Sequence, residues 1–361
     1  MAVHSLATTN FRNLRSGVAT FGPTVNVLYG ANGSGKTNLL EAIFTVCLGR
    51  SQRGAGDGVL LNNNSDFYRL EGKINTAGVE HTLAVAYQRG GRKRLTIDSN
   101  PARTSELFEL SSVVAAGPED SEILSGPPST RRLFLDLYLS QHSATYLADL
   151  SDYQRALAQK NAALRNGFDH APFDPLLVQY GTKVTLERAA FVGNLARRAV
   201  AAYGSIAEGE ELVVEYEPNV PFPLDAMSSK TVSAAFESEL ARQAERERVM
   251  QTSLTGPHRD DIKFGICGLP ARTHGSQGQW RTAAVALKLA VYELLREKRG
   301  EPPVLLLDEI FAELDTDRTR RLVESFGDIS QLFLTTAVRP PDLLMDRAKR
   351  YRVAAGELVE E

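Results

Sequence analysis

The chain has 361 residues, of which 43% are hydrophobic, so it is long enough to bury a large core and favours two domains over one. Its 41 basic and 44 acidic side chains give a net charge of −3, which excludes a global attraction to nucleic acid or an anionic membrane and leaves only local patches for a polyanion. Two cysteines exclude a disulfide framework and a four-cysteine zinc site, and no apolar run approaches ~18 residues, so we expect a cytoplasmic protein that makes no membrane contact.

Residues 25–47 predict a strand, a loop and a helix in succession. Val25, Val27 and Leu28 suit a buried strand. From Leu39 to Cys47, apolar residues recur every three to four positions, as they do on the buried face of a helix. The loop between these elements therefore lies at a helix N-terminus, where backbone N–H groups attract anions.

This loop has the pattern G-x4-G-K-T. Gly30, Gly33 and Gly35 let the backbone turn its N–H groups toward an anion. Lys36 adds a positive charge for the β- and γ-phosphates of a nucleotide, and the Thr37 hydroxyl is placed to bind Mg²⁺. A chance match arises on the order of once in a hundred chains of this length, and the flanking elements make it rarer. We therefore expect a phosphate-binding loop.

The middle of the chain combines strands with helices. Residues 66–98 alternate between apolar and polar side chains around a Gly-Gly pair, which predicts an antiparallel meander. Residues 146–165 and 176–203 carry apolar side chains at helical spacing and predict a helical hairpin. At 1.5 Å per residue its arms reach only ~30 to 40 Å, which excludes a long coiled coil.

Basic residues gather at three places in this middle region. One cluster is Arg92, Lys93 and Arg94 at a turn of the meander, another is Arg131 and Arg132 at the start of a helix, and in the third, Arg242, Arg246 and Arg248 alternate with acids. Phosphate contacts need only summed local charge, so each cluster is a candidate for DNA binding. Most such runs are ordinary solvated surface, which is the alternative interpretation.

A long amphipathic helix is predicted to begin after Ser276, because apolar residues repeat at helical spacing from Ala284 to Leu295. Ser276 suits a helix N-cap. Alternatively, Ser276, Gly278 and the free amides of the helix start form a second anion receptor. The motif alone does not decide between these, but its place in the chain, after the glycine loop and before an acidic strand, favours the receptor.

The acidic strand is the apolar run 304–307, which predicts a buried strand that ends in Asp308 and Glu309. Asp308 can hold the Mg²⁺ shell, and Glu309, on the other face of the strand, can orient and deprotonate a water. An ordinary buried strand that meets an acidic turn is the alternative. The second carboxylate favours water as the phosphoryl acceptor, because a small-molecule kinase would not need it.

These motifs, in this order, resemble those of the ABC-type ATPases of chromosome maintenance, and within them the RecF family of bacterial recombination mediators. The resemblance covers nearly the whole chain. Its marks are NFRNL at 10–14, GANGSGKTNLLEAI at 30–43, GPEDSEILSGPPSTRRLFLD at 117–136, TGPHRDDI at 255–262, SQGQWR at 276–281 and LLLDEIFAELD at 305–315.

The resemblance implies an α/β fold: an ABC-type ATPase head with a mixed, largely parallel P-loop sheet and an antiparallel β subdomain, plus a helical arm without a long coiled coil. The boundaries that we predict are 1–125 for the N-terminal lobe of the head, 126–250 for the arm and 251–361 for the C-terminal lobe.

In this family the signature helix of one subunit covers the ATP held by the P-loop of the other, so the resemblance implies contacts across a dimer. It makes Lys36, Asp308 and Glu309 catalytic, with Thr37 and Asp308 as Mg²⁺ ligands. The residues assigned to trans contacts are Ser276, Gln277, Gly278, Gln279 and, in the D-loop, Asp315. The nucleotide-binding residues are Gly30, Ala31, Asn32, Gly33, Ser34, Gly35, Lys36, Thr37, Asn38 and Arg12.

Two features depart from the transporter-type pattern of these ATPases. The histidine that contacts the γ-phosphate there is replaced by Thr335 or Thr336, which predicts slow hydrolysis. The glutamine of the transporter Q-loop has no clear counterpart. Either Glu119 or Asp120 takes its place, or this loop is structural.

The resemblance further implies an ATP- and Mg²⁺-dependent homodimer in the nucleoid that binds duplex and gapped DNA, with weak, DNA-stimulated hydrolysis that opens it. The implied partners are RecR, with RecO, in the loading of RecA at gaps during repair and replication restart. Two other classes remain open: another ABC-type ATPase, such as an OLD-like nuclease partner or a toxin-system ATPase, and a small-molecule P-loop kinase.

Overall fold

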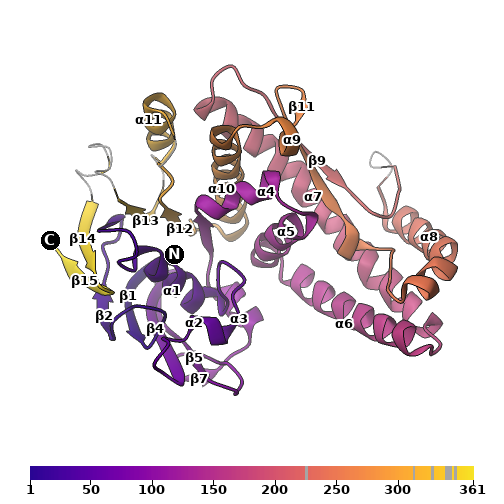
Figure 1. The fold of residues 1–361 in the computed structure, drawn as a ribbon, viewed down its shortest axis with the longest axis horizontal. Coiled ribbons are helices and arrows are strands. Elements are labelled where there is room, and N and C mark those ends of the chain that lie inside the picture. The colour runs from indigo at the N-terminus through magenta and orange to yellow at the C-terminus, as the bar shows by residue number, and fades with distance from the viewer. Residues whose placement is uncertain (224–226, 312–313, 327–328, 338–343, 345–347) are drawn as a thin grey trace. The chain divides into compact units, whose positions relative to one another are not determined.

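The structure is a computed structural model that describes residues 1–223, 227–311, 314–326, 329–337, 344 and 348–361. The chain forms two compact units (Figure 1). The first unit contains Met1–Ser121, Ser205–Glu208 and Gln277–Glu361, and the second contains Glu122–Gly204 and Gly209–Ser276. None of the helices in the described residues combines the length and the apolar character needed to cross a membrane.

The first unit contains a largely parallel sheet with the strand order β15-β14-β3-β13-β12-β8. Its central strands are apolar without alternation, and β8, β12 and β13 are buried along their whole length, as parallel strands covered on both faces are. The carboxyl ends of β3, β12 and β13 therefore meet at one edge, where parallel sheets bind ligands. The strands are β3 (Val25–Tyr29), β8 (Val113–Ala116), β12 (Val304–Asp308), β13 (Gln331–Thr336), β14 (Ala348–Ala354) and β15 (Glu357–Glu360).

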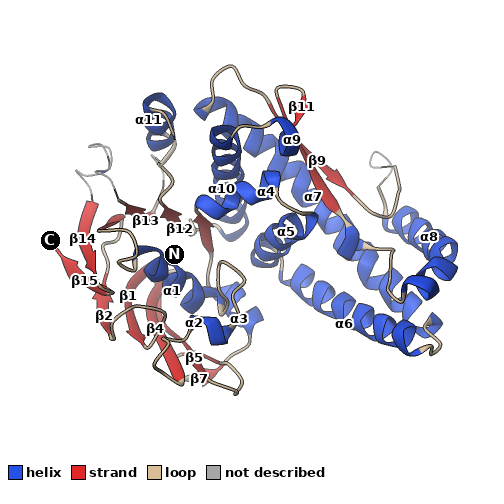
Figure 2. Cartoon of the chain, viewed as in Figure 1, coloured by secondary structure: helices blue, strands red, loops and turns tan. Residues whose placement is uncertain are grey.

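The second sheet of this unit is antiparallel, with the order β2-β1-β4-β5-β6-β7, and it confirms the predicted meander. Figure 2 shows its strands in red beside the short helices of the same unit. Burial alternates residue by residue along β4, so one face of the strand packs on the core and the other meets solvent. The strands are β1 (Ala2–Thr9), β2 (Gly17–Thr20), β4 (Phe67–Thr76), β5 (Val79–Gln88), β6 (Arg94–Ile97) and β7 (Asn100–Pro101).

Helix α1 (Lys36–Leu48) packs against strands of both sheets. Its neighbours are β1, β4 and β5 of the antiparallel sheet and β8, β12 and β13 of the parallel one. Every residue from Leu39 to Leu48 is consequently buried. This all-round packing fixes the helix, and with it the position of the glycine loop that precedes it.

The second unit confirms the predicted helical hairpin, formed by α6 (Ala144–Asn166) and α7 (Asp174–Ile206). With 23 and 33 residues the two helices are about 35 and 50 Å long, so α7 is longer than predicted. Two further long helices complete the unit, α5 (Pro128–His142) and α8 (Ser229–Met250).

The second unit also contains a small sheet, β11-β10-β9, that the sequence did not predict. Strand β9 (Leu212–Glu217) pairs along its whole length with β10 (Asp261–Ile266), and β11 (Leu269–Pro270) follows. Residues 251–276 therefore fold with the second unit and not with the C-terminal lobe to which we had assigned them. Alternation of apolar and polar residues can predict that a segment forms a strand, but it does not show which sheet the strand joins.

The motif TGPHRDDI contributes to a buried ionic network in the second unit. Arg188 on α7 is only 2% exposed. Its guanidinium contacts Asp136 at 2.7 Å and Asp260 at 3.1 Å, and it also donates hydrogen bonds to Pro257 O at 2.6 Å and Tyr146 Oη at 3.0 Å. A buried charge is tolerated only when it is paired and hydrogen-bonded in this way. The motif therefore ties the second unit together.

The remaining helices are mostly short. They are α2 (Asp57–Leu60), α3 (Thr104–Leu110), α4 (Glu122–Ser125), α9 (Ala271–His274), α10 (Gln277–Arg299), α11 (Thr316–Glu324) and the 3-10 turns η1 (Pro118–Ser121), η2 (Ala171–Phe173) and η4 (Pro257–Arg259).

Candidate active site

The glycine loop follows β3 and ends at the first turn of α1, as predicted. Gly30, Gly33 and Gly35 all have positive φ angles, of 154°, 77° and 113°. At Gly30 a Cβ atom would lie 2.2 Å from Val353 O, so no larger residue fits there. Gly35 is the N-cap of α1 in the left-handed conformation. The N–H groups of the first helical turn are thus turned into the loop, where the positive end of the helix dipole favours an anion.

One buried polar group in the loop fits a phosphate. The hydroxyl of Ser34 is buried and has no hydrogen-bond partner among the described residues. A buried hydroxyl without a partner is costly unless a ligand supplies one. Ser34 belongs to the predicted nucleotide-binding set, and its position suits a donor to a phosphate oxygen.

Lys36 is buried, and its ammonium lies among three oxygen atoms. It donates to Gly30 O at 2.8 Å and to Ala31 O at 3.3 Å, and it lies 3.2 Å from the Glu309 carboxylate. The side chain therefore folds back over the loop instead of extending into solvent. A phosphate in the loop would meet this charge directly, with little water to screen it.

Asp308, at the end of β12, meets Thr37 across 271 positions of sequence. The Thr37 hydroxyl donates to Asp308 Oδ1 at 2.9 Å, and the Thr335 hydroxyl donates to the same oxygen at 2.5 Å. A hydroxyl and a carboxylate are the hard oxygen ligands that Mg²⁺ prefers, and they are the pair that holds it in P-loop ATPases. The residues present therefore fit the predicted ion.

Glu309 has a strained backbone, with φ at 48°. Its N–H donates to Thr335 Oγ1 at 3.0 Å, and its carboxylate contacts Lys36 on one side and accepts from the Ala337 N–H at 3.0 Å on the other. Such left-handed non-glycine residues persist where the surroundings hold them, often at functional sites. The conformation directs the carboxylate toward the glycine loop.

Thr335 thus contacts both acids, which the sequence did not predict. We had noted it only as a replacement for the missing histidine. It is paired with Asp308 in the parallel register of β12 and β13, so the two side chains stand at the same sheet edge. The polar residue at the end of an apolar strand was the available indication of this role.

A cavity of about 660 Å³ opens at this edge of the parallel sheet. Its volume lies within the range of small-molecule sites. Of the predicted residues, Asn32, Gly33, Gly35, Lys36, Thr37, Asn38 and Glu309 line it. The lining also includes Thr335 and Thr336, the candidates for the place of the transporter histidine, and residues that the sequence did not single out for the nucleotide: Asn13, Arg53, Pro118, Arg281, Phe311 and Ala337. Asp308 stands behind the hydroxyls of two lining threonines.

The segment that we compared with the transporter Q-loop reaches the cavity through Pro118. Asp120 accepts from the Gly117 N–H at 2.8 Å and contacts Lys288 at 2.8 Å, so it stabilises the loop. Glu119 contacts Arg53 at 3.3 Å, and Arg53 lines the cavity. Of the two candidates, Glu119 is therefore the one linked to the site.

Arg12 points away from the cavity. Its guanidinium makes two hydrogen bonds to Glu41, at 2.9 and 3.2 Å, and a third to Val59 O at 3.0 Å. Asn13, the next residue, does line the cavity and donates to Gly33 O at 3.0 Å. A nucleotide contact by Arg12 stays a prediction, which the geometry of this conformation does not support.

The residues assigned to trans contacts do not line the cavity of their own chain. Gln277 is the first residue of α10, and Gly278 O accepts a hydrogen bond from the Thr282 hydroxyl. Asp315 is the N-cap of α11, where its carboxylate accepts from the Arg318 N–H at 2.8 Å. Arg281, one turn into α10, is the residue of this helix that lines the cavity. The trans roles therefore stay predictions.

The predicted DNA contacts differ in exposure. Arg131 is buried and binds Asp261 with Nε at 2.5 Å and Nη2 at 2.9 Å, so a DNA contact would require this ion pair to break. Arg132 donates to Asp260 O at 2.9 Å, and burial lowers the pKa of its guanidinium. By contrast, Arg92 and Arg94 are exposed. The structure thus favours the cluster in the meander.

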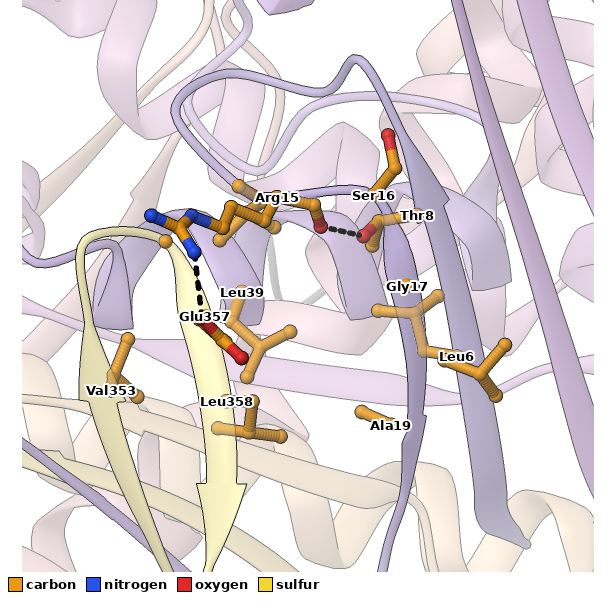
Figure 3. Close-up of a pocket in the computed structure, with 13 residues that line it drawn as sticks. Leu6, Thr8, Arg15, Ser16, Gly17, Ala19, Leu39, Val353, Glu357 and Leu358 are labelled. Atoms are coloured by element: carbon orange, nitrogen blue, oxygen red, sulfur yellow. Dashed lines mark hydrogen bonds and ion pairs between the residues drawn. The ribbon is translucent and has the colours of Figure 1, made fainter.

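A second hollow of about 400 Å³ lies between β1, β2 and the hairpin β14–β15 (Figure 3). Arg15 and Glu357 form an ion pair at its rim at 2.8 Å, and the Thr8 hydroxyl donates to Arg15 O at 3.0 Å. The same hairpin reaches the glycine loop, because the Gly356 N–H donates to Ser34 O at 2.8 Å. These contacts brace the loop from behind.

The fold and the site together define an ATPase head of the ABC and SMC type. The structure is similar over 99% of its length to the Smc head domain of Pyrococcus furiosus, with a TM-score of 0.56 and 15% identity over 96% of that chain. A likeness at this identity shows the fold alone. The chain also matches the model of the RecF/RecN/SMC N terminal domain over residues 2–355.

Relatives of higher sequence identity show which family within this class the chain belongs to. The chain is 36% identical to the DNA replication and repair protein RecF of Staphylococcus carnosus, over 100% of both chains, and 37% identical to that of Geobacillus kaustophilus, over 99% of both. It is also similar to a solved structure of the recombination mediator RecF with ATP, with a TM-score of 0.91 and 28% identity over 99% of this chain and 97% of that one. The chain belongs to the RecF family of DNA replication and repair proteins.

Proposed function

We propose that this chain is an ATP-dependent DNA-binding protein of recombinational repair and replication restart. The observation that carries the proposal is the convergence of Lys36, Thr37 and Glu309 on one cavity, with Asp308 behind them. The solved RecF structure named with ATP, at 28% identity, supports ATP as the nucleotide.

Each residue has a separate task in hydrolysis. The loop N–H groups and Lys36 would bind the β- and γ-phosphates, and Thr37 and Asp308 would hold Mg²⁺, whose charge would offset the negative charge of the phosphates. Glu309 orients a water for in-line attack and accepts its proton. Its ion pair with Lys36 has to loosen before the carboxylate can take this role. The exchange of the histidine for Thr335 or Thr336 fits slow turnover.

ATP would join two copies of the chain. The residues Gln277, Gly278 and Gln279 begin α10, where the positive end of the helix dipole favours an anion, yet they do not line the cavity of their own chain. A γ-phosphate presented by a second copy is the ligand that suits this helix start. ATP then stabilises the closed dimer by its additional contacts there, and hydrolysis removes them.

The biological setting follows from the relatives. Curated relatives are named DNA replication and repair proteins, and the solved structures name the RecFOR pathway. The dimer would bind duplex and gapped DNA in the nucleoid, where DNA stimulates its weak hydrolysis. There it would act with RecR and RecO to load RecA. An ATP turnover that needs no added phosphate acceptor separates this function from that of a small-molecule kinase.

Sedimentation velocity, with and without ATP, tests the dimer. The wild-type chain should dimerise with ATP, and Lys36→Met should bind no nucleotide and stay monomeric. Ser276→Arg should bind ATP but not dimerise, because the added guanidinium blocks the helix start. Thr273→Arg, three residues earlier and exposed, is the matched control and should dimerise. If Ser276→Arg dimerises as the wild type does, the proposed trans contact is wrong.

A further inference from the structure

On the exposed face of the antiparallel sheet, the aromatic ring of Phe67 lies near Arg92 and Arg94. Phe67, at the start of β4, is 50% exposed, although apolar side chains of strands usually face the core. In the register of the sheet, Phe67 is paired with Gln88, and Arg69 is paired with Ala86, which in turn is paired with Arg94. Paired residues share a face, so the ring and the guanidinium of Arg94 stand on the same side.

A hollow of about 350 Å³ lies at this corner of the sheet. Ala86 is the small residue in the row between Arg69 and Arg94, and its short side chain leaves space beside the Phe67 ring. The residues that line the hollow are Asp66, Phe67, Tyr68, Ala86, Tyr87, Gln88, Gly91, Arg92 and Arg94. The space is thus flat and apolar on one side and cationic on the other.

The charges at this corner favour an anion. Two basic side chains of the turn between β5 and β6 form ion pairs. Arg89 contacts Asp66 at 3.1 Å, and Lys93 contacts Asp57 at 3.2 Å. Arg92 and Arg94 make no ion pair with any described residue, and both are exposed. Two positive charges therefore remain unmatched beside the ring. Gly90, with φ at 75°, lets the chain turn tightly and present them together.

We propose that this corner binds single-stranded DNA, with an unpaired base stacked on Phe67 and its phosphates on Arg92 and Arg94. Exposed aromatic side chains on a sheet, flanked by arginines, are how several unrelated folds hold single strands. A duplex keeps its bases stacked inside and offers the ring nothing to contact. The inference rests on the proposed DNA-binding function and adds to it a site for the unpaired strand at a gap.

Binding of a fluorescent oligo(dT) in the presence of ATP tests the site. Phe67→Ala should weaken binding roughly 5- to 100-fold, and Phe67→Tyr should restore most of it, because stacking needs the ring. Arg92→Ala and Arg94→Ala should each lower the slope of log affinity against log salt by about 0.7. Affinity for blunt duplex DNA should change less than twofold in the Phe67 variants.

Two exposed residues outside the hollow are matched controls. Val79, 53% exposed at the start of β5, controls for loss of an apolar side chain. Lys73 lies on the same face of β4 as Phe67 and about 20 Å along the strand, and it controls for loss of a positive charge. Val79→Ala and Lys73→Ala should bind oligo(dT) as the wild type does.

Photo-crosslinking of the unmodified chain supplies a second measurement. An oligonucleotide with a single 5-iododeoxyuridine should crosslink at Phe67, located by mass spectrometry. If the chain binds gapped DNA but shows no such crosslink, and Phe67→Ala binds oligo(dT) normally, this inference is overturned and the proposed function stands. If the wild-type chain binds neither gapped nor single-stranded DNA with ATP, the proposed function fails as well.

Discussion

Charged side chains are buried in both units of the molecule, but they face different surroundings. In the first unit, Lys36 and Glu309 border a cavity of about 660 Å³. In the second, Arg188 is enclosed by Asp136, Asp260 and two further hydrogen-bond acceptors. A closed network satisfies its own charges and has no bonding capacity left for a ligand. An open cluster keeps some capacity to bind a ligand, and this difference separates the structural cluster from the candidate catalytic one.

The largest effect that we expect is on stability, in the closed network. Arg188→Met leaves the buried carboxylate of Asp260 and the partly exposed one of Asp136 without their cation, and it should lower the free energy of unfolding by about 3–5 kcal/mol. Urea denaturation measures this loss. Arg197→Met, on the exposed side of the same helix, is the control and should change stability by less than about 0.5 kcal/mol. An Arg188→Met chain of wild-type stability would remove the distinction between the two clusters.

In the open cluster, at Lys36 and Glu309, a substitution should change the rate of ATP hydrolysis and leave the free energy of unfolding unchanged. Glu309→Gln keeps the shape of the side chain but cannot accept a proton, so single-turnover hydrolysis should slow by roughly 10²- to 10³-fold while ATP still binds. Glu324→Gln, exposed on α11, should hydrolyse normally. Hydrolysis within twofold of wild type in the Glu309 variant would show that another group activates the water.

Thr335 allows a finer test, because it touches both acids of the site. Thr335→Val keeps the volume and removes the hydroxyl that contacts Asp308 and Glu309. Turnover should fall roughly tenfold with little change in KM for ATP, because the phosphate contacts are untouched. Thr335→Ser restores the hydroxyl and should recover most of the rate. A change confined to KM would indicate a role in binding instead of positioning.

A separate effect, of pH on stability, concerns His258, which adjoins the closed network. Its Nε2 donates to Ser253 O at 3.1 Å, so Nδ1 accepts from the Tyr153 hydroxyl at 2.6 Å, and the ring is neutral. Burial lowers the pKa of His258 from 6.5 to about 4. Its contribution to stability is thus complete above pH 6.5 and is lost as the pH falls toward 4, by about 3 kcal/mol.

Comparison of denaturation at pH 7 and pH 4.5 measures this contribution. His258→Gln cannot be protonated in this range, so it should lose less stability than the wild type as the pH falls. Equal losses in the two proteins would show that other groups account for the pH dependence.

The sequence was sufficient to name the candidate catalytic residues because their patterns lie in contiguous stretches. The loop 30–37 and the strand end at Asp308 carry their own spacing and flanking patterns, and the structure brings them together. The meander and the helical hairpin were predicted for the same reason, since alternation and helical periodicity are local. Each of these features is encoded within one continuous segment of fewer than about 60 residues.

Features that depend on distant pairing were missed. Strand β9 pairs with β10, which lies more than 40 positions further along the chain. The sequence of neither strand indicates that the two pair with each other. Arg131 begins a helix in a basic run and looked like surface, yet it is buried against Asp261. Its burial depends on packing against a strand from elsewhere in the chain. Arg281 likewise reaches the cavity only through the placement of α10.

The contact between Gly356 and Ser34 has a consequence for biosynthesis. The glycine loop is made early, but the hairpin that braces it is translated some 320 residues later. At about 5–20 residues per second, the ribosome needs roughly 15 to 60 s to cover that distance. Over this interval the nascent loop lacks its brace, so we expect ATP to stabilise the loop fully only after the hairpin has been made.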